Sequence, residues 1–198
     1  MPIIHDHKII FIHIPKTGGT SIESCFNMKM LNKKNMYGTY NKQEFTHFTA
    51  KDIKASIDEN IWKEYTKFTI IRNPYDKMIS EWKRIVGNLK DEPNQFKNWL
   101  KKVRIPKDHK NKNTTHFTKQ VDFVLEKNKE IVDKIFRFEN YEEVTNFIKI
   151  KTNKIVPHAN RSTHKHYSYY YDEEAKNILE NLYKEDLDYF GYSFSQNP

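Results

Sequence analysis

The sequence predicts an α/β fold in which helices flank a parallel central sheet. Short apolar runs rich in β-branched and aromatic residues predict buried strands at residues 8–14, 66–71 and 135–138. A segment with helical spacing follows each of them. No internal repeat and no convincing linker interrupts this order, so we expect a single domain over residues 1–198. In such folds, ligands bind at the carboxyl ends of the strands.

Each element in the first half has a local signal. Pro15 ends the first strand, and a helix is expected from Gly19 to about Met28. Residues 31–46 are polar and are predicted to be a loop. The second strand, 66–71, ends before "RNP", where a proline suits a first helical turn, and the helix is expected over 75–86.

The second half reads in the same way. A short helix is expected near residues 95–103, followed by the polar stretch 104–117 as a mobile loop. After the third strand, a helix begins at about Tyr141. Residues 172–187 predict an amphipathic helix with acidic residues in its first turn, and Gly191 lies just past its end.

Composition narrows the class of protein. Aromatic residues make up 14% of the chain, which disfavours disorder, and the net charge of +8 favours polyanionic partners such as a nucleotide or an acidic glycan. Cys25 is the only cysteine, which excludes an internal disulfide. With no secretory signal and no apolar run of membrane length, a soluble, cytoplasmic protein without a membrane partner is expected.

The segment "FIHIPKTGGTS" predicts an anion site, because a strand, a glycine turn and a helix leave backbone N–H groups near a helix dipole. Two adjacent glycines allow backbone to approach an anion closely. A lysine adds a point charge, and hydroxyl residues add donors. The predicted binding residues of this loop are Lys16, Thr17, Gly18, Gly19, Thr20 and Ser21.

The order of residues argues against a Mg-ATP loop. A phosphoryl-transferring P-loop carries its lysine after the glycines, whereas Lys16 precedes them here. The second strand leads into Arg72, where a magnesium site would need a carboxylate. Arg72 can bind phosphate through two N–H groups, and Ser80 in the following helix can donate to the same group. Together with the loop, they favour a ligand with two separated phosphate-type groups.

These motifs resemble those of the PAPS-dependent sulfotransferases, especially the group that contains carbohydrate 2-O-sulfotransferases. "FIHIPKTGGTS" is similar to the family's 5′-phosphosulfate loop, and "IIRNPYDKMISEW" to its 3′-phosphate segment. "IFRFENYEE" and "YYYDEEAKNILENLYKEDLDYFGYSF" are similar to its later landmarks. The resemblance implies a P-loop-like fold and sulfuryl transfer from 3′-phosphoadenosine-5′-phosphosulfate (PAPS). Because a sulfuryl group carries less charge than a γ-phosphoryl group, a lysine and backbone amides can stabilise the departing phosphate without a metal. The resemblance also implies that Lys16 contacts the bridging oxygen and that Arg161 lies near the nucleotide as a phosphate contact. A solvated basic loop is the alternative for the segment that contains Arg161.

The acceptor hydroxyl requires a general base. His47, in "FTHFTAKDI", lies where the 2-O-sulfotransferase-like group carries its proposed catalytic histidine. Glu44 and Glu23 are the weaker candidates, and packing beside phenylalanines is the structural alternative for His47. His13 is expected to pack or to form local hydrogen bonds within the strand.

The sequence therefore predicts a sulfotransferase that acts on a hydroxyl group of a small molecule or glycan. A carbohydrate is the leading choice of acceptor. Residues 31–46 and 104–117 are expected to shape the acceptor site. A kinase using Mg-ATP is one alternative. A non-catalytic binder of acidic glycan or nucleic acid is the other, although no RNA-binding module is recognisable, so no nucleic-acid partner is expected.

Overall fold

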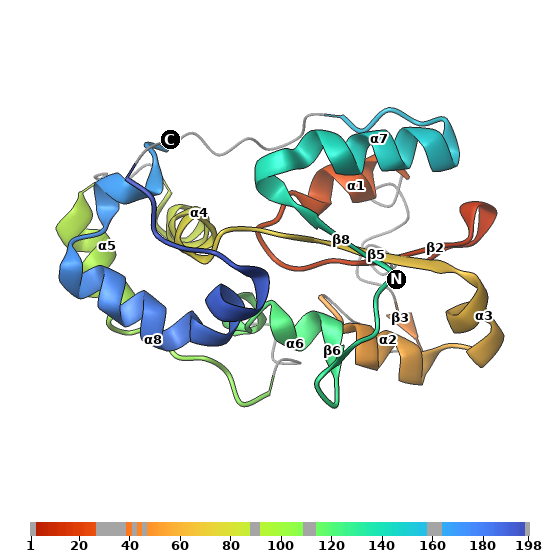
Figure 1. Ribbon diagram of the computed structural model, residues 1–198, viewed down its shortest axis with the longest axis horizontal. Helices are drawn as coiled ribbons and strands as arrows, with labels where there is room; N and C mark the ends of the chain where they lie inside the picture. The colour runs from red at the N-terminus through yellow and green to blue at the C-terminus, as the bar shows by residue number, and fades with distance from the viewer. Residues whose placement is uncertain are drawn as a thin grey trace. The chain divides into compact units, whose positions relative to one another are not determined.

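A computed structural model describes residues 3–26, 39–40, 43–44, 47–87, 92–108, 114–157 and 164–196. The chain divides into two compact units, which are described separately (Figure 1). Unit 1 comprises residues 1–71 and 122–160, and unit 2 comprises residues 72–121 and 161–198. The expectation of one domain over the whole chain stays a prediction.

Unit 1 contains a four-stranded sheet in the order β1-β2-β5-β8. The strands are β1 (Ile3–Ile4), β2 (Ile9–Ile12), β5 (Thr66–Ile71) and β8 (Lys134–Arg137). β1 is antiparallel to β2, whereas β5 is parallel to both β2 and β8. The predicted α/β fold with a mostly parallel central sheet is confirmed.

Helices lie on both sides of this sheet (Figure 1). One side carries α1 (Gly19–Cys25) and α7 (Tyr141–Thr152), and the other carries α2 (Ala50–Ser56) and α3 (Glu59–Glu64). Successive side chains of a strand point to opposite faces, so alternate residues of β2 and β5 pack under α1 and α7. The buried core on that side comprises Ile4, Ile9, Phe11, Ile22, Phe68, Ile70, Val144, Ile148 and Val156.

Unit 2 is helical around α4 (Pro74–Val86), α5 (Pro93–Leu100) and α8 (Glu173–Phe190), with the 3₁₀ helix η4 (Tyr167–Tyr170) packed against α4 and α5. The Asn73 side chain caps α4 by accepting a hydrogen bond from the backbone N–H of the second helical residue. The core of this unit is rich in aromatic residues, and most of the tyrosine run is buried in it. It comprises Tyr75, Met78, Ile79, Trp82, Phe96, Leu100, Val103, Tyr167, Tyr170, Tyr171, Ala175, Leu179, Tyr183 and Leu187.

The predicted bounds hold best where the local pattern is strong. β5 has the predicted bounds, and α4 begins one residue before them. β2 is shorter than predicted at both ends, and α8 extends three residues further, to Phe190. The predicted loop over residues 31–46 was wrong in part, because it contains the strands β3 (Thr39–Tyr40) and β4 (Gln43–Glu44).

None of the described helices is both long enough and apolar enough to cross a membrane. The remaining elements are short. Their bounds are η1 (His5–His7), η2 (Thr115–Phe117), α6 (Val121–Val124), β6 (Leu125–Glu126), β7 (Lys129–Glu130) and η3 (Phe138–Asn140).

Candidate functional site

The glycine loop joins the carboxyl end of β2 to the first turn of α1. Gly18 is the N-cap of α1 and has a φ of 80°, in the left-handed region that favours glycine. Its carbonyl oxygen accepts hydrogen bonds from the Ser21 backbone N–H at 3.0 Å and from the Tyr141 hydroxyl at 2.9 Å. The loop is therefore fixed both to its own helix and to α7.

Both glycines are also required by packing within unit 1. A Cβ atom on Gly18 would lie 2.9 Å from the Tyr141 ring, and one on Gly19 would lie 2.2 Å from the His13 ring. Real Cβ atoms essentially never approach other atoms so closely. The sequence predicted that the glycines serve a bound anion, but the structure gives them a second reason that pattern alone did not reveal.

The loop hydroxyls are not equivalent. Thr17 is fully buried, and its Oγ1 donates to the Ile14 carbonyl oxygen at 2.9 Å. A hydroxyl has one proton to donate, so the side chain of Thr17 already uses it inside the protein. Ser21 is buried and Thr20 is half-buried. The donor that Thr17 can offer to a ligand is therefore its backbone N–H.

His47 lies in unit 1 and contacts the residue that opens the loop. Its Nδ1 is 2.9 Å from the His13 carbonyl oxygen, and the two rings meet edge to face with centroids 4.6 Å apart. Because a carbonyl oxygen only accepts, Nδ1 must carry the proton. In the neutral ring, the lone pair then lies on Nε2, which is the state that a general base requires.

His13 is itself held in place. It follows β2 directly, and its Nδ1 lies 2.7 Å from Glu23 Oε1 on α1. Its ring stacks on Phe11 at 5.4 Å between centroids. The expectation of local packing and hydrogen bonding for His13 is confirmed. Glu23, a weaker candidate for the base, supports His13 in this structure.

Lys16 and His47, the two predicted catalytic residues, share an uncommon backbone conformation. Lys16 has a φ of 67° and His47 a φ of 59°. Left-handed conformations cost free energy in residues other than glycine, and they occur most often at turns, caps and functional sites. Neither conformation was predictable from the sequence pattern.

Arg72 begins unit 2 and is held by both its backbone and its side chain. The Gln120 amide accepts from the Arg72 N–H at 2.9 Å and donates to the Arg72 carbonyl oxygen at 2.8 Å. The Arg72 Nε and Nη2 atoms each lie 2.7 Å from Asp76 Oδ2. Asp76 and the buried Ser80 are four residues apart on α4 and therefore share one face of it.

Sequence reasoning missed two of these supporting residues. Asp76 lies four residues after Arg72 at the start of a predicted helix, and this spacing is a usable signal for an ion pair. Gln120 lies 48 residues from Arg72 and has no local signal. Arg161 and the side chain of Glu44 lie outside the described residues, so their predicted roles remain predictions.

Further along α4, a buried carboxylate is fully engaged. Glu81 accepts from Arg84 Nη2 at 2.6 Å and lies 2.8 Å from His116 Nδ1. Burial by itself would raise the pKa of Glu81, but the hydrogen bonds from Arg84 and His116 outweigh burial and lower the pKa to about 2. Glu81 thus stays ionised at neutral pH and anchors the middle of α4.

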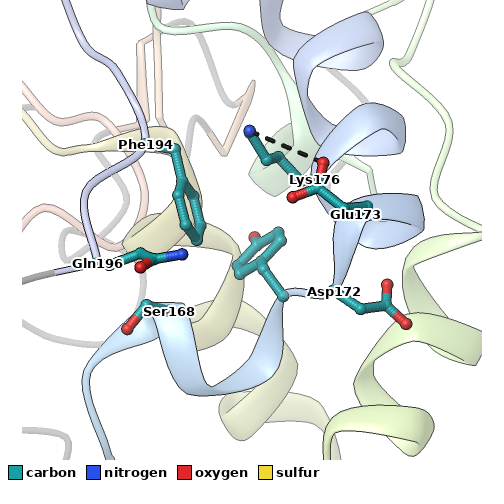
Figure 2. Close-up of a pocket in the computed structure, with 7 residues that line it drawn as sticks. Ser168, Asp172, Glu173, Lys176, Phe194 and Gln196 are labelled. Carbon is teal, nitrogen blue, oxygen red and sulfur yellow. Dashed lines mark ion pairs between the residues drawn. The ribbon is translucent and has the colours of Figure 1, made fainter.

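A cavity of about 450 Å³ opens elsewhere in unit 2 (Figure 2). The Lys176 ammonium lies 3.9 Å from Glu173, and Asp172 is paired with Lys97 at 2.6 Å. Two carboxylates against one lining lysine make this cavity unfavourable for phosphate groups. None of the predicted site residues that the structure describes lines it. The lining is Ser168, Tyr171, Asp172, Glu173, Lys176, Phe194 and Gln196.

The structure thus brings the loop and His47 together within unit 1. In unit 2, the Arg72 side chain binds Asp76, which shares one face of α4 with Ser80. The joining of these two halves into one site stays a prediction. Among the described residues, no group of three or more histidine, cysteine or acidic side chains is arranged to hold a metal ion.

Comparison with known proteins identifies the family. A model of the sulfotransferase family matches residues 2–193. Searches of the curated proteins and of the solved structures found no match. The family match implies sulfuryl transfer on a P-loop-like fold, in agreement with the mixed α/β architecture of unit 1. Since the match covers nearly the whole sequence, the chain belongs to the sulfotransferase family.

Proposed function

We propose that the protein transfers a sulfuryl group from PAPS to a hydroxyl group of a carbohydrate, without a metal ion. The observation that carries this proposal is the bond between His47 Nδ1 and the His13 carbonyl oxygen, 2.9 Å long. It fixes the tautomer that accepts a proton at Nε2, and it does so at the residue from which the glycine loop starts.

In the proposed reaction, His47 Nε2 takes the proton from the acceptor hydroxyl as its oxygen attacks the sulfur atom. The bond between sulfur and the bridging oxygen breaks, and its electron pair remains on the 5′-phosphate. Lys16 stabilises the charge that develops on that oxygen. A positioned donor of this kind typically contributes about 3–4 kcal/mol to lowering the barrier.

Backbone N–H groups of residues 17–20, with the Thr20 and Ser21 hydroxyls, are proposed to hold the 5′-phosphosulfate, because the Ser21 N–H already donates to the Gly18 carbonyl oxygen. The sulfuryl group carries less charge than a γ-phosphoryl group, so one lysine and backbone amides suffice to bind it. The contribution of Thr17 comes through its N–H, because its hydroxyl donates to Ile14.

Arg72 and Ser80 are proposed to bind the 3′-phosphate, with Arg161 as a further contact. Chain connectivity supports this pairing with the loop. β2 and β5 are parallel neighbours, so their carboxyl ends lie at the same edge of the sheet. The glycine loop follows β2, and Arg72 is the residue directly after β5. Two of the five guanidinium N–H groups of Arg72 bind Asp76.

The test is transfer of labelled sulfate from PAPS to a panel of mono- and oligosaccharides. We expect Lys16→Ala to lower kcat by about 10²–10³-fold, since it removes a donor to the leaving oxygen. Lys8→Ala is the matched control, because Lys8 is an exposed lysine of unit 1 that pairs with Glu64 at 2.9 Å. Full activity of Lys16→Ala would overturn the assignment.

Calorimetry separates the alternatives. Binding of 3′,5′-ADP but not of Mg-ATP supports the sulfotransferase, and the reverse supports a kinase. Retained affinity for 3′,5′-ADP with no turnover on any acceptor would indicate a non-catalytic binder.

A further inference from the structure

His164 lies beside the Arg72–Asp76 pair and has no role in the reaction described above. Its side chain is only 8% exposed, and its Nε2 lies 3.7 Å from Asp76 Oδ1. Nε2 is one of three buried side-chain polar atoms, within the described residues, that have no hydrogen-bond partner. Buried polar groups are normally satisfied, so this atom requires an explanation.

The other ring nitrogen determines the protonation state of the ring. His164 Nδ1 lies 2.8 Å from the Lys165 carbonyl oxygen and therefore carries a proton, because a carbonyl only accepts. A neutral His164 then directs the Nε2 lone pair toward a carboxylate oxygen, and two acceptors face each other. A protonated His164 directs an N–H toward the same oxygen, and the contact becomes an ion pair.

The charge of the cluster depends on that proton. Asp76 presents Oδ2 to Arg72 at 2.7 Å and Oδ1 to His164 at 3.7 Å, so one carboxylate lies between two potential cations. With His164 neutral, Arg72 and Asp76 cancel and the cluster carries no net charge. With His164 protonated, the cluster carries one positive charge. An incoming dianion therefore favours the protonated form.

We propose that His164 takes up a proton from solvent when the 3′-phosphate of the nucleotide binds beside Arg72, so that nucleotide affinity depends on pH. This inference rests on the proposed function, because it assumes that the bound group is a phosphate monoester. The proton moves to Nε2, and no covalent bond to the ligand forms or breaks.

The ionisable groups around the cluster are contributed by several elements. The charged groups of the cluster are Asp76, which lies on α4, and Arg72, which is the residue directly after β5. Tyr171 stays neutral, because burial raises the pKa of its phenol well above the ordinary value. Lys165 is directed away, with its ammonium 3.6 Å from the centroid of the Tyr169 ring. Histidine is the side chain whose charge normally changes between about pH 5 and 8.

The direction of the effect follows from linkage. A ligand that binds the form with His164 protonated more tightly loses affinity as pH rises. A phosphate monoester has a second pKa of about 6, and binding as the dianion releases protons rather than taking them up. Uptake of protons therefore identifies a group on the protein, not on the ligand.

The experiment is titration calorimetry of 3′,5′-ADP at pH 7.5 in buffers with different ionisation enthalpies. The slope of the observed enthalpy against buffer enthalpy gives the number of protons taken up. We expect uptake of up to one proton by the wild type, and no uptake with 5′-AMP, which lacks the 3′-phosphate. Absence of uptake with 3′,5′-ADP bound would overturn the inference and leave the proposed function standing.

Two variants refine the result. His164→Gln keeps an N–H donor that does not titrate, so we expect binding without proton uptake and with weaker dependence on pH. His166→Gln is the matched control in the same segment, and its uptake should equal that of the wild type. Uptake retained in His164→Gln would assign the proton to another group and overturn the inference. Failure of the wild type to bind 3′,5′-ADP would overturn the proposed function together with this inference.

Discussion

In the glycine loop of unit 1, the backbone is the predicted binding group, and its shape is set by packing against rings of the protein itself. Around Arg72 in unit 2, the predicted binding group is a charged side chain, and its position is set by Asp76 and by the Gln120 amide. A substitution of a loop glycine therefore acts through geometry, whereas one near Arg72 acts through charge. The two regions should fail in different ways when altered.

The largest expected effect is on turnover, in unit 1. We expect His47→Ala to lower kcat by about 10²–10⁴-fold, because it removes the general base. Affinity for 3′,5′-ADP should be unchanged, since His47 acts on the acceptor. Steady-state kinetics with labelled PAPS measures the first quantity and calorimetry the second. His5→Ala, an exposed histidine of the same unit, is the control. An undiminished kcat would show that another residue is the general base, and Glu44 would be the next candidate.

The corresponding change in unit 2 should affect affinity. Arg72→Lys keeps the charge that Asp76 requires but loses the paired N–H groups of the guanidinium. We expect affinity for 3′,5′-ADP to fall about 10–100-fold, which corresponds to the loss of a hydrogen bond to a charged group. Affinity for 5′-AMP should be unaffected, and this ligand is the internal control. A fall in kcat with affinity retained would contradict the division of roles between the two regions.

Local signals explain which elements of the fold the sequence could predict. β5 and α4 lie at or near their predicted bounds, because an apolar run, a proline and a helical period are local signals. The helices α2 and α3 were missed. Each is under two turns long, which is too short to show a recognisable helical period. The only local signal for α2 is the capping box that Thr49 and Asp52 form at its start.

The candidate site was predictable only in its chemically distinctive residues. Lys16, His47 and Arg72 were found through motif, spacing and resemblance. The contacts that position them are not local: Gln120 binds Arg72 across 48 residues, and Tyr141 bonds to Gly18 across 123. Such partners depend on the folded topology, and a single sequence carries no signal for them.

A smaller effect, on stability, tests the packing of the loop. We expect Gly19→Ala to lower the free energy of unfolding by about 1–3 kcal/mol, because its Cβ overlaps the His13 ring. The double variant with His13→Ala should lose less than the sum of the two single changes. Urea denaturation of the four proteins in this cycle measures the coupling.

Gly87→Ala provides the contrasting control. Gly87 has a φ of 63°, and no atom of the described residues lies within 4 Å of an added Cβ, so backbone strain is what opposes the substitution. The loss at Gly87 should therefore be independent of His13→Ala. Additive losses at Gly19 and His13 would show that ring packing does not account for the glycine.

The smallest expected effect concerns charge in the helical unit and appears only in acid. The folded pKa of Glu81, about 2, is below the ordinary value of 4.5, so the unfolded chain takes up the proton first as pH falls. The stabilisation is thus complete above about pH 4.5 and is lost as pH falls toward 2. Because Arg84 is half-exposed, we expect about 1–2 kcal/mol rather than the full value of the shift.

The measurement is the difference in free energy of unfolding between wild type and Glu81→Gln, followed from pH 7 to pH 2.5. Taking the difference removes the contribution of the other carboxylates, which both proteins share. The difference should shrink as pH falls. Asp188→Asn is the control, because Asp188 forms an exposed pair with Lys184, and such pairs contribute about 0–1 kcal/mol. A difference that does not change with pH would mean that Glu81 stabilises α4 through hydrogen bonding alone. Substitutions in unit 2 would then act through charge at Arg72 but not along α4, the helix that carries its partner Asp76.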